Sequence, residues 1–88
     1  MQAITTKYIG PSNIKGSRVK AQCQAGSVTL GWDDSLNSDQ NHTLAAQTLA
    51  RKLGWTYGTW HGGGLPNGDG CVFVCADRPD MSFTLTAI

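Results

Sequence analysis

The sequence predicts one α+β domain over residues 1–88, in which an antiparallel sheet of about five strands carries a single helix on one face. Two observations support this prediction. Apolar and polar residues alternate in short segments at both ends of the chain, which is typical of half-buried strands. Between these segments, apolar residues recur at helical spacing up to Gly54. The expected order is strand, strand, strand, helix, strand, strand.

Three strands are predicted before the helix, joined by short turns as in an antiparallel meander. The first, Ala3–Ile9, is rich in Thr, Tyr and Ile, and it places Ile4, Thr6 and Tyr8 on one face. The strands Ser17–Gln24 and Ser27–Trp32 alternate in the same way. Their inward residues are Val19, Ala21 and Cys23 in one, and Val28, Leu30 and Trp32 in the other.

The helix is predicted from a Ser38 N-cap to Leu53. Asp39 favours its amino end through the helix dipole, and Arg51 and Lys52 favour its carboxyl end. Gly54 follows where a left-handed residue ends a helix, and Trp55 is expected to pack back on the last turn.

Two further strands are predicted after the helix. Cys71–Ala76 is an apolar run typical of a central strand, and Asp77–Asp80 is a turn. Met81–Ala87 alternates again, and an unpaired edge strand of this length favours a homodimer.

Composition excludes several function classes. A net charge of +1 is far from that of an avid nucleic-acid binder, although the first 32 residues hold Lys7, Lys15, Arg18 and Lys20 and no acid. We expect no signal peptide, and no apolar run is long enough to span a bilayer. The three cysteines are an odd number, which indicates free thiols in a cytoplasmic protein without membrane contact.

The segment His61–Gly70, HGGGLPNGDG, holds five glycines in ten residues. Its first four residues match the oxyanion-hole HGGG of some lipases, but no G-x-S-x-G elbow accompanies them. A phosphate loop would need a lysine where Asp69 stands. We therefore expect a structural turn between helix and strand, with a short strand near Tyr57–Trp60, or else a recognition loop.

No catalytic or metal-binding cluster stands out, so no enzymatic activity, metal or cofactor is expected. Cys71 and Cys75 lie about 13 Å apart if they share a strand, too far to hold one zinc ion together. His42, within the helix, is expected to pack or cap, and Asp33 to anchor the loop after Trp32.

Two surfaces are candidate binding sites. The first is a cationic sheet face with Lys7, Arg18 and Lys20, with Lys15 nearby, and its alternative reading is a solvated face. The second is an aromatic patch beside the glycine segment, comprising Tyr57, Trp60 and His61, and its alternative reading is packing at the core edge.

The chain contains the stretches ITTKYIGPSNIKGSRVKA, WDDSLN, Asn41-His42, AAQTLARKLGW and GGGLPNGDGCVFV. Together these stretches resemble small uncharacterised proteins carried by phages and mobile elements of proteobacteria. The resemblance covers nearly the whole chain and implies an accessory protein that binds a host protein surface. The expected function is a non-catalytic protein-binding module that inhibits a bacterial defence complex such as a CRISPR effector. The alternative is a nucleic-acid-binding accessory protein that uses the basic sheet face.

Overall fold

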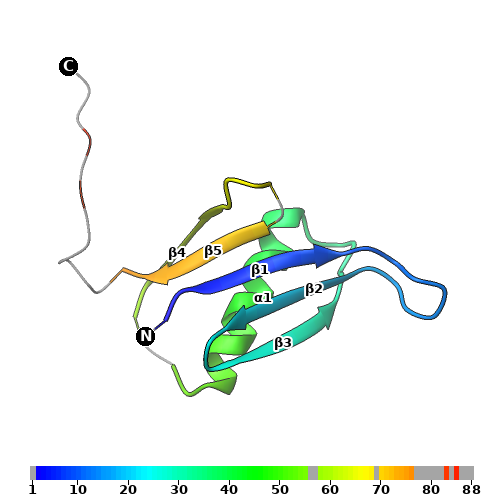
Figure 1. The fold of residues 1–88 in the computed structure, drawn as a ribbon, viewed down its shortest axis with the longest axis horizontal. Helices are drawn as coiled ribbons and strands as arrows, with labels where there is room; N and C mark the ends of the chain where they lie inside the picture. Colours follow the sequence, from blue (N-terminus) through cyan, green and yellow to red (C-terminus); the bar gives the residue numbers. More distant parts are fainter. Residues whose placement is uncertain (1, 56–57, 69, 77–82, 84, 86–88) are drawn as a thin grey trace.

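The computed structural model describes residues 2–55, 58–68, 70–76, 83 and 85. It contains a five-stranded antiparallel sheet, in the order β3-β2-β1-β5-β4, with one helix behind it (Figure 1). The elements are β1 (Ile4–Ile9), β2 (Arg18–Cys23), β3 (Gly26–Gly31), α1 (Ser38–Lys52), β4 (Trp60–Gly64) and β5 (Gly70–Cys75). The predicted fold class is confirmed.

The three amino-terminal strands form as predicted, within a residue or two at their ends. The strands β1 and β2 pair with Tyr8 opposite Val19, and β2 and β3 form a hairpin closed at Cys23 and Gly26. Ile4 and Thr6 are buried, as are Val19 and Ala21. Tyr8 is 49% exposed, but its ring meets Trp32 edge-on at 5.0 Å between centroids.

The helix begins one residue earlier than the sequence indicated. The N-cap is Asn37 and not Ser38, because Asn37 Oδ1 accepts from the Gln40 amide while Gln40 Oε1 accepts from the Asn37 amide. This capping box satisfies two amides at the helix start. At the other end Gly54 has φ +81°, and Trp55 N–H donates to Ala50 O, which is the predicted glycine termination.

The expectation that the glycine segment only reverses the chain is wrong. Trp60–Gly64 is the edge strand β4, antiparallel to β5, and only the residues after it turn the chain. Leu65 N–H donates to Gly70 O, and Gly68 has φ +76° in that turn. The predicted strand Met81–Ala87 lies outside the described residues, apart from Phe83 and Leu85, for which no strand is assigned.

The core lies between α1 and the sheet. The helix packs mainly on β2, also on β1 and β3, and only slightly on β5. Its buried alanines and Leu49 meet Ile4, Val19, Ala21 and Phe73. The helix therefore covers β1, β2 and β3 more than the rest of the sheet (Figure 1). The face of β4 on the helix side of the sheet is left largely uncovered.

Two buried polar residues of the helix stabilise this arrangement. His42 Nδ1 lies 2.7 Å from Thr6 Oγ1, and burial lowers the pKa of this histidine despite the opposing effect of Asp39. Asn41 Oδ1 accepts from the Asp33 amide, and its Nδ2 donates to the carbonyls of Asp33 and Asn37. His42 packs as expected. The role of Asn41 as a clamp on the β3–α1 loop was not foreseen.

Candidate functional site

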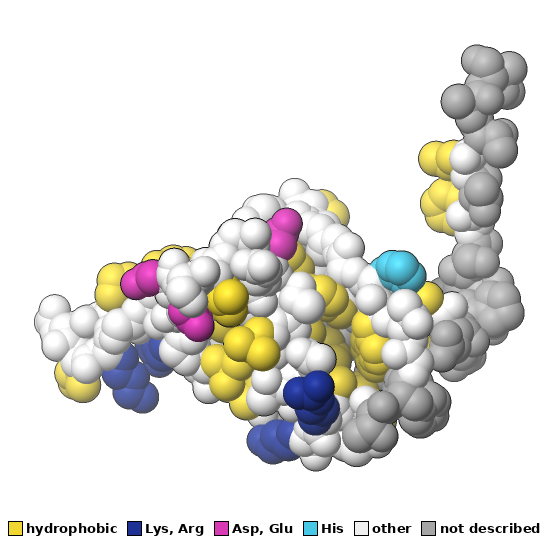
Figure 2. Space-filling model, turned by 180° about the vertical axis from the view of Figure 1, so that it is seen from behind, with side chains coloured by type: hydrophobic (Ala, Val, Ile, Leu, Met, Phe, Trp, Pro, Cys, Tyr) yellow, Lys and Arg dark blue, Asp and Glu magenta, His cyan; other side chains and the backbone are white. Residues whose placement is uncertain are grey.

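A groove runs between α1 and β4 on the helix side of the sheet. Its main part has a volume of about 610 Å³. Ala46 and Ala50 line it from the helix, Trp55 and Trp60 from the segments that follow, and Phe73 from β5. Hydrophobic side chains are visible in the depression beside the helix in Figure 2, which views the molecule from behind Figure 1.

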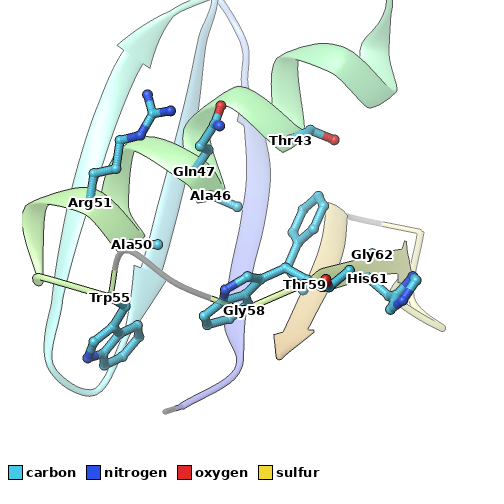
Figure 3. A pocket seen from close by; sticks show the side chains of 12 residues that line it. Thr43, Ala46, Gln47, Ala50, Arg51, Trp55, Gly58, Thr59, His61 and Gly62 are labelled. Carbon is cyan, nitrogen blue, oxygen red and sulfur yellow. The ribbon is translucent and has the colours of Figure 1, made fainter. Parts of the chain in front are cut away.

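The rim of the groove is polar. Thr43, Gln47 and Arg51 succeed one another along the helix at intervals of four residues, and Figure 3 shows their side chains along its upper margin. The smaller Ala46 and Ala50 lie below them. An apolar interior with a few polar groups at its margin is typical of a ligand or peptide site.

Two tryptophans form one end of the groove. The rings of Trp55 and Trp60 are stacked, with centroids 6.1 Å apart and planes 15° from parallel. The helix termination positions Trp55, whose amide bonds to Ala50 O, and the ladder to Cys75 positions Trp60. Stacked, half-buried aromatic rings are frequent anchors of protein interfaces.

Gly62 shapes the floor of the groove. It lies opposite Phe73 in the ladder, and a β-carbon at Gly62 would lie 2.4 Å from Phe73 Cε2. The aromatic ring therefore occupies the space that a side chain at this position would need. Gly63 and Gly64 have nothing within 4 Å of such a β-carbon, so the sheet surface there is open.

A smaller hollow of about 310 Å³ continues the groove along the helix. It shares Thr43, Gly62 and Phe73 with the larger part and extends to Gly64 and Cys71. The two hollows together follow the length of β4, which is the shape an extended segment requires.

The free edge of β4 forms the outer wall of this groove. Ala76 N–H donates to Thr59 O, and Leu65 N–H donates to Gly70 O, so residues 59 and 65 point their backbone groups toward β5. Direction alternates along an antiparallel ladder. The amides and carbonyls of Trp60, Gly62 and Gly64 therefore point away from β5, and no strand among the described residues pairs with them.

The opposite edge of the sheet is protected. Lys52 Nζ donates to Ser27 O at 3.0 Å, so a helix side chain covers a carbonyl of the edge strand β3. Lysine is a common guard of sheet edges because strand addition would have to displace or desolvate its charge. The glycines of β4 provide no such guard.

The predicted basic residues share the sheet face away from the helix. Lys7 stands directly opposite Lys20, and Arg18 is opposite Ile9 in the same ladder. The Nε atom of Arg18 is buried and has no hydrogen-bond partner among the described residues. Lys15 lies exposed in the β1–β2 loop, beside a hollow that Arg18 also lines. The alternation thus placed three of the four cations on one face.

The structure describes two of the three residues of the predicted aromatic patch. Trp60 lines the groove. His61 follows it on β4 and also lines the groove, with its ring directed away from the helix (Figure 3). Tyr57 lies outside the described residues. Phe73 and Gly62 were not predicted as groove residues, because their contact depends on the pairing of β4 with β5.

Asp33 holds the loop after β3 through hydrogen bonds to Ser35. Ser35 donates to Asp33 Oδ1 through its amide, at 2.9 Å, and through its hydroxyl, at 2.6 Å. These hydrogen bonds lower the pKa of Asp33, with the hydroxyl contributing most, and the carboxylate anchors the loop as predicted. Within the described ranges no three His, Cys, Asp or Glu side chains gather as a metal site. Cys23, Cys71 and Cys75 are free thiols.

Comparisons with known proteins found no match among protein-family models, curated proteins or solved structures. In the described part of the chain, no helix has the length and apolar character needed to cross a membrane.

Proposed function

We propose that the chain is a non-catalytic protein-binding module that holds an extended segment of a partner protein along β4. The observation that carries this proposal is the apolar groove whose outer wall is an unguarded strand edge. A segment added to this edge gains main-chain hydrogen bonds, and its alternate side chains turn toward the groove. Its register is set by the outward groups of Trp60, Gly62 and Gly64.

The groove has room for a large apolar side chain of that segment. Its volume of about 610 Å³ is comparable to that of pockets that take whole small molecules. Burying one leucine or phenylalanine stabilises a complex by about 1.5–3 kcal/mol. The stacked tryptophans offer a rigid wall for such a side chain, with little loss of rotamer freedom on binding.

The resemblance to phage-borne accessory proteins supports a host protein as the partner. We propose that the partner is a bacterial defence complex such as a CRISPR effector, and that occupation of its exposed strand or segment inhibits it in the cytoplasm. This proposal needs no cofactor and no covalent chemistry.

Synthetic peptides in which Leu or Phe alternates with Ser or Thr test the groove directly. We expect fluorescence anisotropy to detect their binding to the folded protein. Gly64→Pro removes an outward amide of β4 and should weaken binding by about tenfold, whereas Gly64→Ala keeps the amide and should weaken binding much less. Equal binding by the two variants would contradict strand addition.

The basic face favours a second candidate function, the binding of nucleic acid. Its specific support is the Lys7–Lys20 pair, because like charges directly opposite each other destabilise a sheet unless an anion binds there. Contacts from Lys7, Lys15, Arg18 and Lys20 to about four phosphates predict a log–log salt slope of about −3 to −4 on duplex DNA. A salt-independent signal, or one that survives in the Arg18→Glu/Lys20→Glu variant, would exclude this function.

A further inference from the structure

The chain carries a segment that fits the groove. Residues 81–88, MSFTLTAI, contain no charge, proline or glycine and alternate Met81, Phe83 and Leu85 with Ser82, Thr84 and Thr86. Short segments of this composition add readily to open sheet edges. Phe83 and Leu85, which the structure describes, are each 86% exposed.

We propose that Met81–Ala87 of a second copy pairs with β4 and turns its apolar side chains into the groove, and that two copies exchange these segments reciprocally. The inference rests on the proposed function, since it names an occupant for the same site. The exchange produces a closed, two-fold symmetric dimer in which each partner fills the other's groove.

The spacing of the two strands is complementary. On β4, the inward positions that also offer free amides and carbonyls are Trp60, Gly62 and Gly64, two residues apart. The apolar residues Met81, Phe83 and Leu85 recur with the same spacing. The absence of side chains at Gly63 and Gly64 leaves the sheet surface there open to an incoming segment. Three apolar side chains thus meet three inward positions over about 17 Å of strand.

A second copy suits this segment better than its own chain. Both edges of β5 are already paired, with β1 and β4, so the segment cannot form a hairpin with the strand it follows. To reach β4 in its own chain it would have to cross the start of that strand within residues 77–80, which include Pro79, and then run parallel to it. A second copy allows the antiparallel pairing, which is the more stable one.

The exposure of the two described residues agrees with this argument. Phe83 and Leu85 do not line either hollow of their own groove. Among the described residues, Phe83 and Leu85 therefore do not fill the apolar groove of their own chain. Reciprocal exchange covers these side chains and the groove at once and adds backbone hydrogen bonds along β4.

The test is the mass of the full chain in solution, measured by light scattering and sedimentation over a concentration series. We expect a dimer, and we expect Phe83→Asp/Leu85→Asp to raise its dissociation constant by at least about 100-fold because four apolar side chains, two from each copy, lose their contacts. The matched control Thr84→Asp/Thr86→Asp places the same charges on the other face of the segment and should remain dimeric. A monomeric unmodified chain, or equal effects of the two double variants, would overturn the proposal.

A labelled peptide of residues 77–88 separates this inference from the function beneath it. It is added to the full-length Phe83→Asp/Leu85→Asp protein, and we expect binding that Gly64→Pro weakens by about tenfold and that Gly64→Ala, which keeps the outward amide, weakens much less. If only unrelated alternating peptides bind, the inference fails and the proposed function stands. If no peptide binds, both fail. A monomer whose own amides 81–87 are protected from hydrogen exchange would show pairing within one chain and would also overturn the dimer.

Discussion

Substituting alanine for Gly62 tests whether the glycine segment shapes the groove or merely connects two elements. The new β-carbon would lie 2.4 Å from Phe73 Cε2 and 2.7 Å from Phe73 Cδ2. Ordinary contact distances are about 3.4–4 Å, so the ring must move by about 1 Å. Phe73 is only 8% exposed, and it lies opposite the buried Ile4 of β1 in the sheet. Movement of the Phe73 ring therefore disturbs the core.

Overpacking of this kind costs about 1–3 kcal/mol. For a domain of this size, each kcal/mol lowers Tm by about 4–8 °C. Gly63→Ala is the matched control, because nothing lies within 4 Å of its β-carbon, and its unfolding free energy should change by less than about 0.5 kcal/mol. Urea unfolding of both variants measures the difference.

A double-variant cycle shows whether the loss comes from the ring. Gly62→Ala should cost much less in a Phe73→Leu background, because the shorter side chain vacates part of the contested space. The reasoning is refuted if Gly62→Ala and Gly63→Ala are equally stable. It is also refuted if the cost of Gly62→Ala is the same with and without the Phe73 ring.

The buried polar residues and the helix cap give three further predictions. Burial lowers the pKa of His42, so the unfolded chain takes up the proton more readily. The unfolding free energy should therefore fall as the pH drops below about 6.5, with His42→Gln removing the effect and His61→Gln retaining it; titration by urea unfolding between pH 5 and 8 checks this. Asn37→Ala should cost about 1 kcal/mol in the same assay and Ser38→Ala much less, and equal costs would contradict the assigned cap. Asn41→Ala leaves the Asp33 amide without its acceptor and should cost about 1–3 kcal/mol, so a neutral outcome would contradict the clamp.

Much of the fold was predictable because its signals are local. Alternation over six residues fixes which side chains of β1 and β2 face the core, and the observed burial of Ile4, Val19 and Ala21 follows it. The helix end was predictable for the same reason, since Gly54 and Trp55 act through hydrogen bonds within one turn. The start was misplaced by one residue although the deciding signal, Gln40 three residues after Asn37, is present in the sequence.

The sequence predicted a short strand near Tyr57–Trp60, whereas the edge strand is Trp60–Gly64; its extent was missed because glycines carry no periodic signal. A strand is recognised by the alternation of its side chains, and three of the five residues of β4 have none. The fit of Gly62 under Phe73 depends on a pairing between residues that are remote in sequence. No local pattern encodes that contact.

For the candidate surfaces too, local patterns were predictable and contacts between remote residues were not. Alternation correctly placed Lys7, Arg18 and Lys20 on one face, but the direct opposition of Lys7 and Lys20 depends on how the β1–β2 loop sets the register. The groove depends on where the helix crosses the sheet, a result of packing over the whole domain. Sequence patterns therefore indicated which residues to consider without showing which of them meet.

The incomplete cover of the sheet is a consequence of size, and it explains why the glycines and the open edge occur together. A helix is about 10 Å wide, whereas five strands extend over about 19 Å, so one helix cannot cover the whole inner face. Here it lies over β1, β2 and β3, and side chains on the inner face of β4 would be left partly in water. Glycine at positions 62 and 64 reduces the apolar area exposed there, which makes an uncovered strand tolerable. The same absence of side chains leaves the backbone of β4 accessible. The glycines that reduce exposed apolar area on this strand therefore also allow another strand to pair with it.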